Sequence, residues 1–203
     1  PIGTLLSLKK YPLITGLLVC IVLFNIAQHS THSTWTFFTI EKFGWTEKLV
    51  GYSLGFIGLL AAIVQGGLIR IIIPKFGNIK SVYLGMFFYI IGLFLFSIAN
   101  EGWMVFAFAI PLSLGGISGP ALQGIMTNKI PDDEQGEFQG GMTSLVSLTA
   151  IIGPILMTNL FSFFTSNESS IYFPGAPFVL AAILSVFGLI IAIKTLSGSK
   201  VRY

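Results

Sequence analysis

The sequence predicts an all-α integral membrane domain that crosses the bilayer six times. Apolar residues make up 54% of the 203 residues and charged residues only 9%, against roughly 25% charged in an ordinary soluble domain. The mean hydropathy of +0.86 agrees with this fold class. A helix needs about 20 apolar residues to cross the hydrocarbon layer. Six stretches qualify, at 11–39, 48–73, 81–99, 102–129, 136–164 and 176–195.

The segments that separate the six spans contain glycine, proline or charged residues, which favour turns over continued helix. In chain order these segments are EKFGWTEK, PKFGNIK, NEG, PDDEQG and SNESSIYFPG. The fifth span has the clearest start, because Pro131 is followed by three acidic residues that suit the positive end of a helix dipole.

Glycines and prolines inside the spans predict close helix contacts and kinks. The prolines within spans are Pro111, Pro120 and Pro154, and each removes a backbone donor and bends the helix. Glycines at short helical spacings let two helices approach closely. Those expected to do so are Gly51, Gly55, Gly58, Gly115, Gly116, Gly119, Gly136 and Gly140.

Basic residues predict which side of the membrane holds the two termini. Lys42 and Lys48 are the only two of the eleven basic residues in the loops on the far side, and the other nine lie on the side of the termini. By the positive-inside rule both termini are therefore cytoplasmic. Residues 1–10 then lie on the cytoplasmic side, 11–195 form the six-helix domain and 196–203 are a cytoplasmic tail. The net charge of +3 needs no nucleic-acid partner, because it follows from this loop asymmetry.

Asparagine, glutamine and histidine concentrate in four of the six spans. The first, second, fourth and fifth spans contain them, whereas 81–99 and 176–195 contain none. A polar helix face at membrane depth turns towards protein or a watery cavity, while an apolar helix can face lipid. The chain therefore divides into two triplets, each with two cavity-lining helices and one peripheral helix. Such a three-plus-three pattern is expected of secondary transporters.

The candidate substrate-cavity residues come mainly from one stripe of the first span. At about 100° per residue the stripe comprises Asn25, Gln28, His29, His32 and Thr36. Gln65 of the second span and Gln123 of the fourth complete the predicted lining. Hydrogen-bonded contact between packed helices is the alternative role for the stripe. Two histidines are too few ligands for a metal site, so we expect no metal and no cofactor.

An intramembrane serine protease is a rival class. The GISG stretch of the fourth span, with Ser118, resembles the G-x-S-G motif of rhomboid-type proteases, which pair that serine with a histidine on the sixth helix. The span 176–195 has no histidine, and a serine without a base is a weak nucleophile. We therefore expect no catalytic residue and no enzyme activity. A membrane scaffold without transport activity is a further alternative.

A longer segment carries a family resemblance. GPALQGIMTNKIPDDEQGEFQGGMTSLVSLTAIIGPILMT, residues 119–158, is similar to the end of the tenth helix and most of the eleventh in tetracycline-resistance-type exporters of the major facilitator superfamily. Residues 43–65 and 100–106 resemble the same branch. The resemblance implies the C-terminal half of a twelve-helix transporter, helices seven to twelve, whose partner is a six-helix N-terminal half. It also implies that residues 1–10 are the end of the central cytoplasmic loop. A start without an initiator Met or signal peptide favours such a segment as well.

The same resemblance implies an activity, namely proton-coupled efflux of small amphipathic compounds or drugs across a bacterial inner membrane by alternating access. Two positions depart from the tetracycline exporters, because Tyr89 stands where they carry an aspartate and Ala61 where they carry a histidine. All eight acidic residues of the chain lie in loops or at helix ends. A proton-coupling carboxylate is therefore expected in the other half, and a nutrient or sugar facilitator of the superfamily is the alternative.

Overall fold

The computed structural model describes residues 12–166 and 169–198, and every regular element in these ranges is a helix. The longer helices are α2 (Pro12–His32), α4 (Glu47–Ile63), α5 (Ile69–Ile98), α6 (Gly102–Leu114), α8 (Gln135–Thr165) and α9 (Ala176–Gly198). The shorter elements are α3 (Trp35–Phe43), the π-helical turn η2 (Val64–Leu68), the 3-10 turns η3 (Gly115–Ile117) and η4 (Asp132–Glu134), and α7 (Ser118–Thr127). The predicted loop 1–10 and the tail beyond Gly198 lie outside the described residues.

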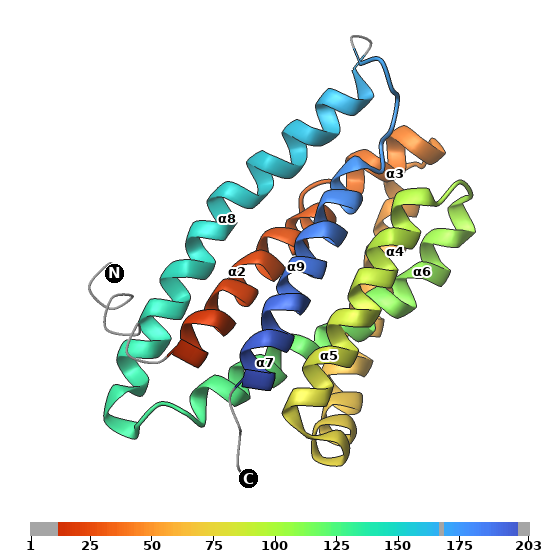
Figure 1. The fold of residues 1–203 in the computed structure, drawn as a ribbon. Coiled ribbons are helices and arrows are strands. Elements are labelled where there is room, and N and C mark those ends of the chain that lie inside the picture. The colour runs from red at the N-terminus through yellow and green to blue at the C-terminus, as the bar shows by residue number, and fades with distance from the viewer. Residues whose placement is uncertain (1–11, 167–168, 199–203) are drawn as a thin grey trace.

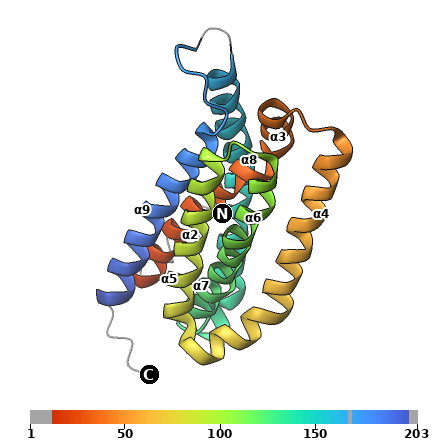
Figure 2. The same ribbon diagram turned by 90° about the vertical axis from the view of Figure 1, so that its right-hand side faces the viewer.

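The stretch Glu47–Ile98 makes two passes, because a kink divides it into two helical parts. Its 52 residues would measure about 78 Å as one straight helix, more than twice the hydrocarbon thickness of about 30 Å. Gly77 breaks the helix with φ 77° and ψ 162°, a conformation that needs glycine. The first of these passes thus comprises α4, η2 and the start of α5, and the rest of α5 returns beside them (Figure 2). The five apolar helical stretches of the described chain thus give the six predicted passes.

The first predicted span is two helices rather than one. α2 ends at His32, and α3 begins at Trp35. Just before the break, side-chain hydroxyl groups compete with backbone N–H groups for the backbone carbonyls. Thr31 Oγ1 donates to the carbonyl three residues earlier at 2.8 Å, and Thr34 donates to the carbonyl of Ser30. Such bonds bend helices, and here the run of serine and threonine ends one.

The centre of the bundle is formed by α2, α5 and α9. Figure 1 shows α9 between α2 and α5, with α8 on the other side of α2. α6 and α7 pack against α5. Glycine permits these contacts, because a Cβ on Gly85 would lie 2.7 Å from the backbone nitrogen of Ser118, and one on Gly92 would lie 2.7 Å from the Leu112 backbone.

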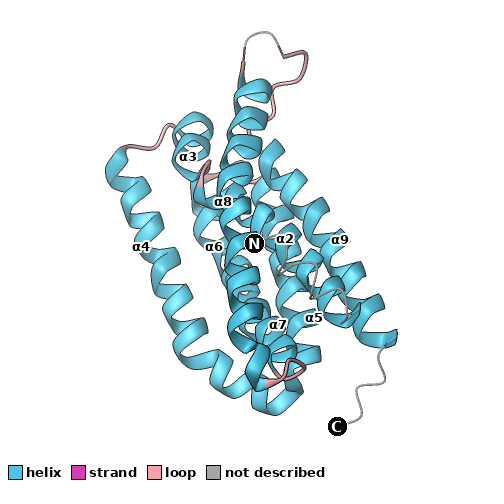
Figure 3. Cartoon of the chain, turned by 90° about the vertical axis from the view of Figure 1, so that its left-hand side faces the viewer, coloured by secondary structure: helices cyan, strands magenta, loops and turns pink. Residues whose placement is uncertain are grey.

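The glycines predicted to mediate packing mostly do not. Only Gly115 has a tight neighbour, since its Cβ would lie 2.6 Å from Tyr89 Cβ. Gly116 has one described atom near 4 Å, and the rest have none within that distance. The reason is orientation, because spacing along a helix does not determine which face meets another helix. The glycines of α4 are the clearest case, since Figures 2 and 3 show that helix along the margin of the bundle.

Candidate functional site

A cavity of about 300 Å³ lies between α2, α4 and α6. Its lining comprises Phe24, Gln28, Thr31, His32, Trp35, Leu54, Ile57, Ala61, Gln65, Tyr89, Leu112, Ser113 and Gly116. Leu54 is 48% exposed and Gln65 is exposed, so the cavity opens to the surface along α4 and η2. No residue of α8 or α9 belongs to this lining.

Three of the seven predicted site residues, Gln28, His32 and Gln65, line this cavity. The cavity-facing side of α2 is centred on Gln28, with Phe24, Thr31 and His32 within about 60° of it around the helix axis at 100° per residue. The predicted stripe was centred further round, on the side of Asn25 and His29. Those two residues lie about 60° and 100° from Gln28.

The other four predicted residues lie elsewhere. The Asn25 side chain donates to the carbonyl four residues earlier at 2.9 Å, within its own helix. His29 packs against α8, because a Cβ on Gly153 would lie 2.3 Å from His29 Cδ2. Thr36 on α3 and Gln123 on α7 are exposed, and neither lines the cavity. The interface role that the sequence left open thus fits the position of His29.

Two buried hydroxyl groups at the cavity were not among the predicted site residues. Tyr89 and Ser113 belong to the lining, and their hydroxyl oxygens are buried without a hydrogen-bond partner among the described residues. The Thr31 side chain is near the Tyr89 hydroxyl, and Thr31 Oγ1 itself donates to the carbonyl of Gln28. A buried hydroxyl without a partner costs about 1–3 kcal/mol, so a ligand that reached these two oxygens would remove that cost.

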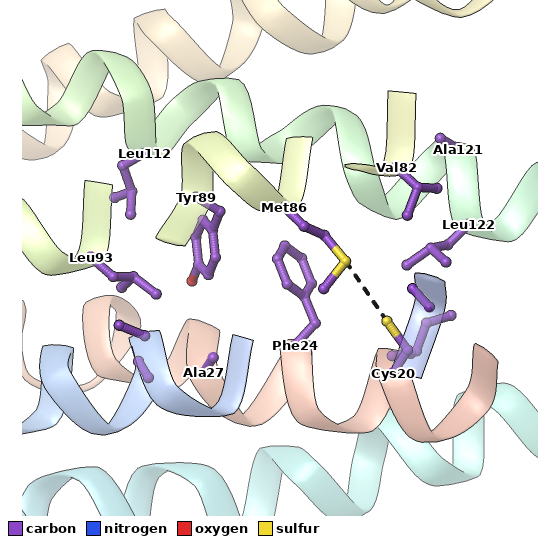
Figure 4. Packing of buried hydrophobic residues seen from close by; sticks show 14 of the residues in the cluster. Cys20, Phe24, Ala27, Val82, Met86, Tyr89, Leu93, Leu112, Ala121 and Leu122 are labelled. Atoms are coloured by element: carbon purple, nitrogen blue, oxygen red, sulfur yellow. Dashed lines mark hydrogen bonds between the residues drawn. The ribbon is translucent and has the colours of Figure 1, made fainter. Parts of the chain in front are cut away.

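The ring of Tyr89 is held firmly by its neighbours. Its centroid lies 4.7 Å from that of Phe24, and Gly115 leaves room for its ring (Figure 4). The span 81–99 was expected to be peripheral, yet the buried face of α5 brings Tyr89 to the cavity. The sequence marked this position only as a departure from the exporters' aspartate. A tyrosine in an apolar span carries no other signal.

Gln65 lies in a segment with an unusual backbone conformation. It lies in the π-helical turn η2, whose sequence VQGGL includes Gly66 and Gly67. π-helical turns are rare and occur frequently at functional sites. The turn lies in the second pass, and Gln65 is its cavity-lining residue.

The polar groups of the cavity lining include amides and hydroxyls, together with one imidazole. Within the described part of the chain, no Asp, Glu, Lys or Arg lines it. Amide, hydroxyl and imidazole groups stand among aromatic and aliphatic walls, as is usual for sites that bind small molecules. The described residues include no group of three or more metal-ligating side chains.

Ser118 does not form a catalytic site. It is fully buried, and its hydroxyl donates to the carbonyl of Gly115 at 2.7 Å. Both histidines of the chain are on α2 rather than α9. The serine instead packs closely against α5 at Gly85.

The model of the Major Facilitator Superfamily matches residues 1–154, about three quarters of the chain. The chain belongs to the major facilitator superfamily. Members of this superfamily are transporters and not enzymes, which excludes the protease alternative. The predicted fold class is confirmed, since an all-helical membrane domain with six passes corresponds to half of a major facilitator fold.

Several tetracycline resistance proteins are similar to this superfamily member. The class E protein of Escherichia coli is 36% identical over 149 residues, which are 73% of this chain and 37% of that protein. The class C protein of Escherichia coli is 29% identical over 162 residues, 80% of this chain and 41% of that protein. The human Hippocampus abundant transcript-like protein 1 is 23% identical over 202 residues, which cover 92% of this chain and 40% of that protein. The chain spans about two fifths of the length of these relatives.

Proposed function

We propose that the chain is the C-terminal six-helix half of a secondary active transporter, which exports small amphipathic organic compounds in exchange for protons. The observation that carries this proposal is the cavity between α2, α4 and α6, whose lining has no Asp, Glu, Lys or Arg and includes Tyr89 and Ser113, each with a buried unpaired hydroxyl. The whole transporter would lie in a bacterial inner membrane with the termini of this segment in the cytoplasm.

The cavity suits an amphipathic ligand for two reasons. The rings of Phe24 and Trp35 provide apolar surface, while Gln28 and Gln65 provide amide donors and acceptors. A ligand that pairs with the two free hydroxyls would remove their desolvation cost, so each contact favours binding. A sugar, which is polar over most of its surface, would leave much of the apolar wall without an apolar contact.

The side on which the cavity opens agrees with alternating access. Major transporter folds bind substrate near the midplane between two halves that rock about the site. The opening along α4 and η2 is the side on which a second six-helix half would complete the site. Proton exchange would then use a carboxylate of that half, since no acidic residue lines the described cavity.

The relatives support the choice of cargo. Several proteins similar to this chain are named for tetracycline resistance, which favours a drug-like compound over a nutrient. The resemblance to the tetracycline exporters places Tyr89 where those proteins carry an aspartate. Tetracycline is therefore a compound to test and not the assigned substrate.

The test compares hydroxyl deletions in the full-length protein. We expect Tyr89→Phe and Ser113→Ala to keep or raise thermal stability, because each removes a buried unpaired group. Each should also raise the KM for efflux of ethidium or tetracycline, by about 2- to 10-fold per lost hydrogen bond. Ser185→Ala is the matched control, since Ser185 Oγ is also buried without a described partner but lies on α9 away from the cavity.

Two outcomes would contradict the proposal. If both cavity variants export every compound as the Ser185→Ala protein does, the cavity is not the binding site. If uphill transport in energised vesicles continues after nigericin and valinomycin with K⁺ collapse both the pH gradient and the membrane potential, proton exchange is excluded.

A further inference from the structure

A second cavity, of about 530 Å³, lies between α5 and α9. Its lining comprises Phe76, Lys80, Tyr83, Leu84, Phe87, Leu189 and Ile193. This groove is separate from the first cavity, because the two use opposite faces of α5. Met86 and Tyr89 are buried towards the core, whereas Leu84 and Phe87 are exposed on the outer side.

The groove lies on an apolar outer surface. Besides its own lining, the exposed residues of α5 and α9 include Phe94, Ile183, Val186, Phe187 and Ile190. An exposed face of this kind on a membrane helix is in contact with acyl chains. The absence of Asn, Gln and His from 81–99 and 176–195 agrees with this environment.

Cations gather at one end of the groove. Lys80 is part of the lining, and Lys75 Nζ lies 5.7 Å from the ring centroid of Phe76, which forms the groove wall. Figure 1 shows that the start of α5 and the end of α9 are at the same end of the bundle. Neither helix contains an Asp or Glu, whereas α5 also carries Arg70 and α9 carries Lys194.

We propose that the groove binds an anionic phospholipid, with one acyl chain between α5 and α9 and its headgroup phosphate at Lys80 and Lys75. Basic pockets between transmembrane helices on the cytoplasmic side bind anionic headgroups. A lysine stem can lie along apolar surface while its ammonium group remains at the interface. Tyr83 also lines the groove, and tyrosine is enriched at membrane interfaces.

The apolar groove and the cations together define the ligand class. An inorganic phosphate would use only the lysines, and a neutral lipid would use only the apolar groove. An anionic phospholipid uses both, and it is the abundant membrane molecule with an acyl chain attached to a negative headgroup. This site concerns the lipid environment of the protein and does not depend on which compound it transports.

The experiment measures lipid selectivity with the purified full-length protein in phosphatidylcholine nanodiscs. Trace phosphatidylglycerol or phosphatidylcholine, spin-labelled on the acyl chain, reports the motionally restricted fraction by electron paramagnetic resonance. We expect a several-fold preference for phosphatidylglycerol, lost in Lys75→Gln/Lys80→Gln. Lys48→Gln is the control, because Lys48 Nζ lies over the Tyr52 ring on α4, 5.8 Å from its centroid and outside the groove.

A second variant tests the acyl-chain part. Leu189→Trp fills the groove, so it should reduce the restricted fraction of both labelled lipids while leaving Lys80 in place. Equal selectivity of the double lysine variant and the Lys48→Gln control would overturn the proposal. So would an unchanged restricted fraction in Leu189→Trp, or nanodiscs that hold two copies of the protein joined through α5 and α9.

Discussion

Trp35 Nε1 donates a hydrogen bond to Ser53 Oγ at 2.9 Å, and both side chains are buried. The bond joins α3 to α4, whose only other buried residue is Val50. The Trp35 ring also meets Phe96 of α5 edge to face, with centroids 5.2 Å apart. Since Trp35 lines the cavity, this contact holds the cavity wall and α4 together.

Ser53→Ala should therefore destabilise the protein. It leaves the buried indole N–H without an acceptor, which costs about 1–3 kcal/mol. Ser97→Ala is the matched control, because Ser97 is equally buried but donates only to the carbonyl of Phe94 in its own helix. Thermal unfolding in detergent would measure both, and equal midpoints for the two variants would show that the indole bond does not stabilise α4.

Gly153→Ala should disrupt the contact between α2 and α8. The new methyl group would lie 2.3 Å from His29 Cδ2, and overpacking of this kind costs about 1–3 kcal/mol. Gly140→Ala on the same helix has no described atom within 4 Å and should be neutral or stabilising. We expect His29→Ala to restore the stability of Gly153→Ala. A Gly153→Ala protein as stable as Gly140→Ala would contradict the packing.

The two histidines should differ in their effects. His32 lines the cavity, so His32→Ala should weaken efflux while the amount of protein in the membrane stays normal. His29 packs against α8, so His29→Ala should lower the protein level more than the transport per molecule. Transport assays normalised to immunoblots separate these effects. The reverse pattern would place the substrate path on the α8 side of α2.

The orientation predicted from the basic residues can be measured by cysteine labelling. In a Cys20→Ala background, Ser197→Cys should react with an impermeant maleimide only from the cytoplasmic side. Ile171→Cys, in the exposed loop between α8 and α9, should react only from the opposite side. Labelling of Ser197→Cys from the periplasmic side would reverse the topology.

The loop before α9 should show an alkaline transition. Tyr172 Oη donates to Glu41 Oε1 at 2.8 Å, and partial burial, the hydrogen bond and the carboxylate charge raise the pKa of Tyr172 above its ordinary 10.0. A raised pKa means that the contact is intact below pH 10 and is lost as the pH rises through the raised value. Glu41→Gln should lower the pKa of Tyr172, measured as the tyrosinate absorbance that Tyr172→Phe removes. An unchanged titration in Glu41→Gln would contradict the contact.

The passes themselves could be predicted from the sequence because membrane helices are determined locally. A segment in hydrocarbon must satisfy its backbone hydrogen bonds internally, so a sufficiently long apolar stretch becomes a helix whatever its neighbours are. Gly77 illustrates the same point, since the segment PKFGNIK marked the turn between the second and third passes. The break at the end of α2 was missed because competition by serine and threonine hydroxyls depends on local geometry as well as composition.

The partners of each helix face were decided only by the tertiary structure. Gln28 and His29 are adjacent in sequence and equally polar, yet one lines the cavity and the other packs against Gly153. One residue turns a helix by about 100°, so a small rotation of α2 reassigns a whole stripe. Tyr89 reaches the cavity because Phe24 and Gly115, both distant in sequence, pack around its ring. Periodicity along one helix contains no information on where the other helices lie, and that is why composition predicted six passes but only part of the cavity.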